Sequence, residues 1–181
     1  IDLIFVDSRS IHSKAAEIIN IYNNLSDNQK NIVNFMSIID KLEGPNNFPI
    51  LYMLSFLYYF FIPNPLVLIP FNALSHSLSS VLLFKIFKII SKNDKNSLIA
   101  SVPFIFFPIS FYWNLQILKD GYFILGCYGV LFTLIKLYKI LIIDFSIDNK
   151  FILKILKLIV IYNLSIFLIY TFRPYYIQLL N

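Results

Sequence analysis

The sequence predicts an all-α membrane protein, a polytopic transmembrane helical bundle with about five spans and amphipathic helices at its outer face. Three apolar runs are long enough to cross a bilayer, because a helix rising about 1.5 Å per residue needs about 20 apolar residues. Lysines gather between these runs rather than inside them. Hydrophobic residues make up 58% of the 181 residues and charged residues only 14%, with a mean hydropathy of +0.72. This composition excludes an ordinary soluble domain.

The predicted spans are five apolar runs of unequal length. In chain order they cover residues 48–62, 66–90, 98–118, 121–143 and 151–172. The first run is short, so its span either takes in residues 66–69 or begins lower in the membrane interface. We therefore divide the chain into an outer-face segment, residues 1–47, and a transmembrane bundle, residues 48–181. Because the sequence begins at Ile1 inside an apolar stretch, we expect it to be an internal fragment of a larger protein.

The orientation follows from two lysine clusters, in residues 85–95 and 136–157. They are two loops apart and so share one face, which the positive-inside rule makes cytoplasmic. The net charge of +5 therefore indicates membrane orientation, and we expect no nucleic-acid partner. Residues 1–47 mix acidic and basic side chains, which suits a non-cytoplasmic segment.

Residues 1–47 carry a helical pattern of their own. Apolar residues recur at helical spacing, at Ala15, Ile18, Ile19 and Tyr22. They predict an amphipathic helix on the membrane surface or against the bundle. Asn and Ser in residues 23–27 break this helix, and a second one is predicted from about Gln29 to Leu42.

Three charged residues at the outer ends of spans are the first candidates for a site. Lys119 and Asp120 lie between two spans with no Gly- or Pro-rich loop to solvate them, and Arg173 ends the last span before Pro174. Charged groups at such depth are costly and often functional. The alternative is that the cations reach toward lipid phosphates and that Lys119 and Asp120 cap helices.

Asp7 and His12 form a second candidate site at the start of the outer-face segment. A carboxylate and an imidazole could share a metal ion or a proton-transfer role. The alternative is that Asp7 is a helix N-cap and His12 an ordinary surface residue. A polar stripe in residues 66–90, made of Asn72, Ser75, His76, Ser79 and Ser80, is interpreted as a helix-packing surface.

Together these features resemble the GT-C superfamily of membrane glycosyltransferases, of the protein-mannosyltransferase and aminoarabinose-transferase type. The pattern Asp7-x-x-x-Ile11-His12-x-x-Ala15 is similar to one found in some members, with Ile11 in place of tyrosine. The stretches PLVLIPFNALSH (65–76) and PISFYW (108–113) and the pair Lys119-Asp120 complete the resemblance.

The resemblance implies an enzyme that moves a sugar from a polyprenyl-phosphate donor to an acceptor hydroxyl of a glycan, lipid or protein. Asp7 would be the general base, and His12 would orient Asp7, the acceptor or a divalent metal ion. Lys119, Asp120 and Arg173 would form the donor-phosphate site. The enzyme would be integral to a bacterial inner membrane, in contact with membrane lipids. A polysaccharide exporter or flippase component and a polysaccharide polymerase remain the alternatives.

Overall fold

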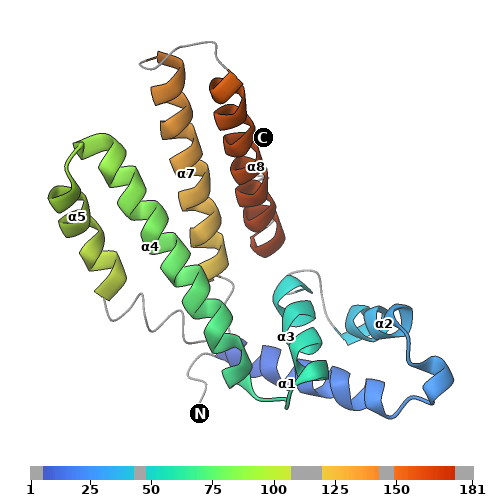
Figure 1. The fold of residues 1–181 in the computed structure, drawn as a ribbon. Helices are drawn as coiled ribbons and strands as arrows, with labels where there is room; N and C mark the ends of the chain where they lie inside the picture. Colours follow the sequence, from blue (N-terminus) through green and yellow to red (C-terminus); the bar gives the residue numbers. More distant parts are fainter. Residues whose placement is uncertain (1–5, 43–47, 107–119, 143–148, 174–181) are drawn as a thin grey trace.

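The computed structural model describes residues 6–42, 48–106, 120–142 and 149–173, and in these ranges the chain is entirely helical (Figure 1). This confirms the all-α prediction. The α-helices are α1 (Val6–Asn23), α2 (Ile32–Leu42), α3 (Phe48–Phe60), α4 (Ile69–Ser91), α5 (Asp94–Phe106), α7 (Asp120–Ile142) and α8 (Asn149–Phe172). Two 3-10 turns, η1 (Asp27–Gln29) and η2 (Pro65–Leu68), precede α2 and α4.

Three helices are long and apolar enough to cross a membrane. They cover Pro65–Ser91, Asp120–Ile142 and Phe151–Phe172, which are 27, 23 and 22 residues long. They stand side by side as α4, α7 and α8, with α5 folded back along α4 (Figure 1). Many large apolar side chains of α8 are exposed, as expected for a helix that faces lipid. The chain is therefore a membrane protein by helix length and composition.

The predicted five-span bundle is not confirmed. The helix α3 has 13 residues and reaches about 20 Å, less than the hydrocarbon thickness of about 30 Å. The predicted span 98–118 begins in α5, which ends at Phe106, and its remaining residues lie outside the described part of the chain.

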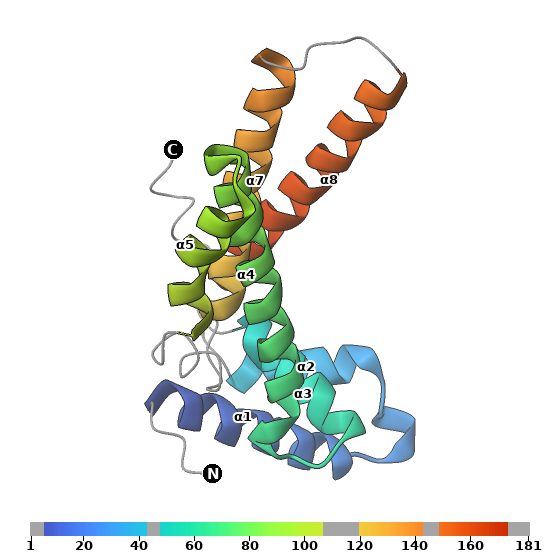
Figure 2. The same cartoon turned by 60° about the vertical axis from the view of Figure 1, so that its left-hand side comes forward.

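Helices α1, α2 and α3 form a separate layer at one end of the three long helices (Figures 1 and 2). The apolar positions predicted for α1 are buried, namely Ala15, Ile18, Ile19 and Tyr22, and they pack mainly toward α3. This confirms the amphipathic helix. The helix α2 starts at Ile32, later than predicted, because Asn31 caps it by accepting a hydrogen bond from the Asn34 amide at 2.8 Å.

One hydrophobic cluster joins this layer to the long helices. It contains Ile11 and Ala15 of α1, Leu54 of α3, Tyr122 at the start of α7 and Phe172 at the end of α8. The N-terminal end of α7 and the C-terminal end of α8 therefore belong to the same core as the α1–α3 layer. The lysine clusters lie at the opposite ends of these helices.

This two-ended arrangement allows a direct test of orientation. In a Cys127→Ser background, Asn28→Cys lies in the layer and Asn96→Cys lies at the lysine end, and both positions are exposed. We expect a membrane-impermeant thiol reagent to label position 28 in intact cells and position 96 only after permeabilisation. The reverse pattern would invert the predicted topology.

Candidate functional site at the end of the long helices

An ion pair between Arg173 and Asp120 marks the end of the bundle that carries the α1–α3 layer. The Arg173 Nε donates to Asp120 Oδ1 at 3.0 Å, and a terminal guanidinium nitrogen donates to the same oxygen. The two side chains are 24% and 23% exposed, so the pair is shielded without being sealed from solvent. Asp120 begins α7 and Arg173 directly follows α8. Each charge therefore lies at a helix end whose partial charge has the opposite sign, which is favourable.

The sequence pattern predicts that Lys119, Asp120 and Arg173 lie at one surface. The structure brings Asp120 and Arg173 into direct contact across 53 residues of chain. Lys119 lies outside the described residues. The ion-pair partner of Asp120 could not be predicted from the sequence, because Lys119 is the cation closest to Asp120 along the chain.

Next to this pair, α4 and α7 are held together by polar contacts. The buried Tyr122 hydroxyl donates to Asn72 Oδ1 at 2.8 Å, and the Ser75 hydroxyl donates to the Gly121 carbonyl at 3.1 Å. Tyr122 also stacks on Phe172 of α8, with ring centroids 4.7 Å apart. The network therefore links all three long helices directly beside the ion pair.

The polar stripe of α4 is a packing surface, as predicted. Four of its five members are at most 8% exposed: Asn72, Ser75, Ser79 and Ser80. The Ser79 and Ser80 hydroxyls donate to carbonyls one turn earlier in α4, each at 2.8 Å. His76 stacks on Phe104 of α5, and its Nε2 lies 3.4 Å from the Ile105 carbonyl oxygen.

His12 is fixed by a contact between α1 and α3. Its Nδ1 lies 2.7 Å from the Tyr58 hydroxyl, and the two rings meet edge to face. Burial lowers the pKa of His12, so the neutral imidazole is favoured near pH 7. When Tyr58 donates to Nδ1, the neutral tautomer carries its proton on Nε2.

Asp7 lies in the first turn of α1, and its side chain is outside the described part of the structure. Positions 7 and 12 are five residues apart in one helix, which separates them by about 140° around its axis. Among the described residues no three His, Cys, Asp or Glu side chains group closely enough to hold a metal ion. We therefore assign no ligand set to a divalent ion.

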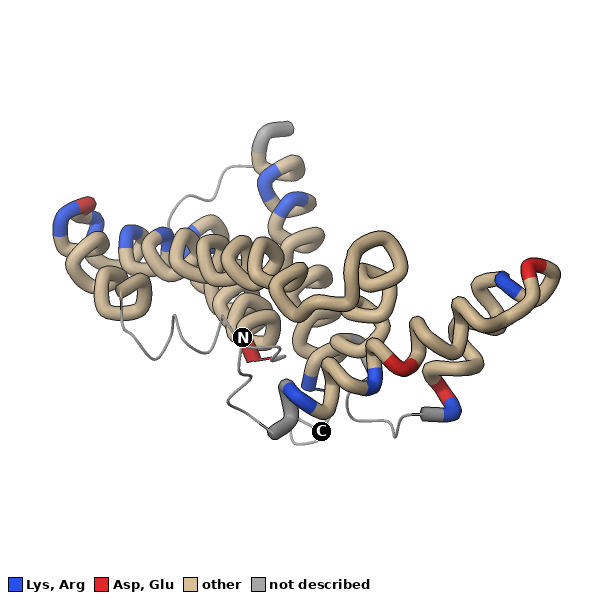
Figure 3. The backbone as a smooth tube through the Cα atoms, turned by 90° about the horizontal axis from the view of Figure 1, so that it is seen from below, with Lys and Arg blue, Asp and Glu red and all other residues tan. Residues whose placement is uncertain are grey.

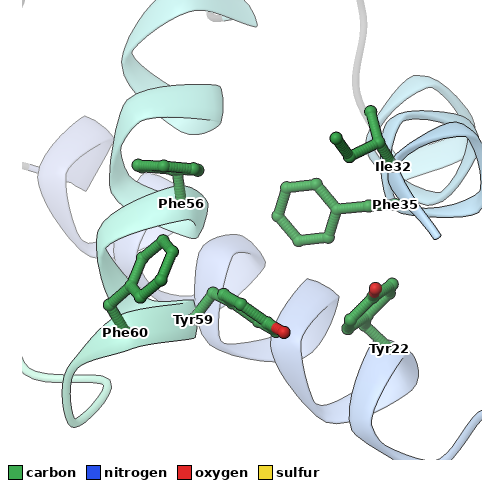
Figure 4. A pocket seen from close by; sticks show the side chains of 6 residues that line it. All are labelled: Tyr22, Ile32, Phe35, Phe56, Tyr59 and Phe60. Carbon is green, nitrogen blue, oxygen red and sulfur yellow. The ribbon is translucent and has the colours of Figure 1, made fainter. Parts of the chain in front are cut away.

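An aromatic cavity of about 210 Å³ opens within the α1–α3 layer (Figure 4). It is lined by Tyr22 of α1, Ile32 and Phe35 of α2, and Phe56, Tyr59 and Phe60 of α3. The sequence analysis did not identify it, although the dense aromatic run in residues 56–61 was a visible signal. Its walls are aromatic and aliphatic side chains, with the hydroxyls of Tyr22 and Tyr59 as their polar groups.

The described part of the chain thus places an ion pair, a positioned imidazole and an aromatic cavity at one end of three apolar helices. Comparison with known proteins returned no family, no curated protein and no solved structure that matches this chain.

Proposed function

We propose that this protein is a membrane glycosyltransferase that moves a sugar from a polyprenyl-phosphate donor to an acceptor hydroxyl at the non-cytoplasmic face. The observation that carries the proposal is the partly exposed Arg173–Asp120 pair at the end of the long helices. A lipid-linked donor would present its phosphate close to the ends of the membrane-spanning helices, which is where this pair lies.

The pair suits a phosphate site for a chemical reason. A guanidinium has its N–H donors in a rigid fork that matches phosphate oxygens. Asp120 fixes the plane of this fork, so the orientation of Arg173 is set before the donor arrives. Lys119, the preceding residue in the sequence, would add a point charge for the departing polyprenyl phosphate.

In the proposed reaction Asp7 removes the proton of the acceptor hydroxyl, and its oxygen attacks the anomeric carbon of the sugar. The carbon–oxygen bond to the phosphate breaks with inversion of configuration, and polyprenyl phosphate leaves. His12, held by Tyr58, would orient the acceptor.

We also propose a bundle of about five spans in a bacterial inner membrane, with residues 98–118 as one of these spans. The first of these spans contains α3 and is short, so it would begin within the membrane interface, where exposed aromatic residues such as those of α3 concentrate. The acceptor would be a glycan, a lipid or a protein.

The exporter alternative has less support in the described residues. An exporter needs polar groups that line a path through the bilayer. The polar stripe of α4 instead makes hydrogen bonds within α4 and to α7, so it is committed to helix packing. This observation favours the enzyme.

The experiment is a transfer assay with the full-length protein in liposomes and a panel of polyprenyl-phosphate sugars. We expect one donor to yield a glycosylated product with release of polyprenyl phosphate. If no donor in the panel is consumed while the protein moves lipid-linked sugar between leaflets, the protein is an exporter and the glycosyltransferase proposal is wrong.

Donor binding provides a separate prediction for the phosphate site. We expect Arg173→Gln to weaken binding of the polyprenyl-phosphate sugar about 10-fold or more, because a charge-assisted bidentate contact is lost. Lys41→Gln removes an exposed cation from the last turn of α2 and serves as the control. The affinity is measured by flotation with labelled donor. If the Arg173 variant binds the donor as tightly as the parent protein does, Arg173 has a structural role and does not bind the donor phosphate.

A further inference from the structure

Six lysines from three helices line one groove at the end of the bundle opposite the ion pair. They are Lys85, Lys88 and Lys92 of α4 and its C-terminal cap, Lys136 and Lys139 of α7, and Lys154 of α8. The groove has a volume of about 520 Å³, and Ile89, Phe132 and Ile140 form its apolar wall.

The groove opens where the long helices are not in close contact. The helices α7 and α8 touch closely where Gly126 and Gly129 face Ser165, and they diverge toward the lysine end (Figure 2). Lysines spaced by three or four residues share one face of α4. The Lys136 ammonium also lies 5.3 Å from the centre of the Phe132 ring, which directs it along the groove wall.

Positive charge at this end is only sparsely balanced. Residues 85–95 and 136–157 contain nine lysines and three aspartates. Asp94 pairs with Lys88 at 2.9 Å, whereas Asp144 and Asp148 lie outside the described residues. Figure 3 shows acidic and basic residues interleaved along α1 and α2, while basic residues predominate in the rest of the molecule. The positive-inside rule asks only for lysines on this face and does not require them to line one groove.

The backbone conformation of Lys92 is a further feature of the groove. Lys92 ends α4 in the left-handed conformation, with φ of 54° and ψ of 15°. Glycine is the usual residue at such a helix end, because a side chain is strained there. The sequence keeps a lysine at this strained position, and its side chain lines the groove.

We propose that the lysine groove binds the headgroup of an anionic phospholipid from the surrounding membrane. The ligand chemistry is phosphate oxygens against ammonium groups. A lipid is favoured over a free anion because the groove lies where three apolar helices end and has an apolar wall of its own. Lysines on three different helices suit a headgroup with two phosphates. This site is independent of the proposed glycosyl transfer.

The test measures lipid retention by the full-length protein in nanodiscs of neutral phosphatidylcholine doped with a diphosphatidyl lipid. The variant Lys136→Gln with Lys139→Gln should bind about 30-fold more weakly, because each substitution removes a direct ammonium–phosphate contact in the groove and each such contact is expected to contribute a factor of about five. The matched control is Lys95→Gln with Lys157→Gln, which removes two exposed cations in the same regions that do not line the groove. This control should bind within about twofold of the parent protein, because screened surface charges contribute little.

Each outcome is decisive. Equal losses in the two double variants would mean diffuse surface attraction and would overturn the groove. Competition by millimolar inorganic phosphate would mean a free-anion site and would overturn the lipid assignment. Lys92→Gly separates binding from folding, because it should raise the melting temperature and still weaken lipid retention. If the Lys92→Gly protein retains lipid as well as the parent protein does, Lys92 does not contact the lipid and the proposed groove is wrong at this position.

Discussion

Replacing Asp7 by Asn is expected to lower the rate of sugar transfer by about 10²–10⁴-fold while donor binding stays intact. An acceptor hydroxyl is a weak nucleophile, and a positioned carboxylate supplies this factor by removing its proton. Asn keeps the size of the side chain and cannot act as a base. Asp7 opens α1, and the same helix carries His12 and reaches the core shared with α7 and α8.

The measurement is single-turnover transfer at saturating donor, with donor binding measured separately. Asp27→Asn is the matched control, because Asp27 is an exposed carboxylate in the turn after α1 and pairs only with neighbouring Lys30 among the described contacts. Asp120→Asn distinguishes the two roles, since it should disturb Arg173 and so weaken donor binding. If Asp7→Asn is active and Asp120→Asn is not, the base moves to Asp120. If both variants stay active, the enzyme proposal fails.

The second large effect is expected where α7 and α8 pack through glycine. A Cβ added at Gly126 would lie 2.9 Å from the Ser165 carbonyl oxygen and 3.3 Å from the Ile169 nitrogen. Both atoms belong to the backbone of α8, so the helices must separate to admit the methyl group. We expect Gly126→Ala to lower the free energy of unfolding by about 1–3 kcal/mol, the usual cost of overpacking.

Gly129 offers a matched comparison on the same helix face. A Cβ there would overlap the Ser165 hydroxyl, which is a side-chain atom. Ser165→Ala should therefore restore part of the stability lost by Gly129→Ala and none of that lost by Gly126→Ala. Denaturant unfolding in one detergent compares six proteins: the parent, the three single variants, and each glycine variant combined with Ser165→Ala. Equal rescue of both glycine variants would show that the backbone contact at Gly126 does not limit the helix separation.

The sequence predicts those features of this protein that depend on local pattern. Length and apolar composition are enough for α4, α7 and α8, because a membrane span is set by the thickness of the bilayer. Periodicity is enough for the buried face of α1. The predicted span 48–62 is not confirmed, since α3 ends at Phe60 before the Pro63-Asn64-Pro65 turn and holds only 13 residues.

Contacts between distant parts of the chain cannot be predicted from length, composition or periodicity. The pairs Arg173–Asp120, His12–Tyr58 and Tyr122–Asn72 span 53, 46 and 50 residues. A single sequence gives the chemical character of each partner and not their pairing. The location of Asp120 and Arg173 at one surface was therefore predictable, whereas the direct contact that fixes Arg173 became visible only in the fold.

The hydrogen bonds of α4 also bear on how the protein enters its membrane. The Ser77, Ser79 and Ser80 hydroxyls all donate to carbonyls one turn back in the same helix, each at 2.8 Å. A translocon can therefore release α4 into lipid as a single helix with these hydroxyls already satisfied. Asn72 and Ser75 are different, because their contacts to Tyr122 and Gly121 require α7. We therefore expect α4 to enter the membrane as a single helix and to gain the contacts of Asn72 and Ser75 with Tyr122 and Gly121 when α7 docks beside it.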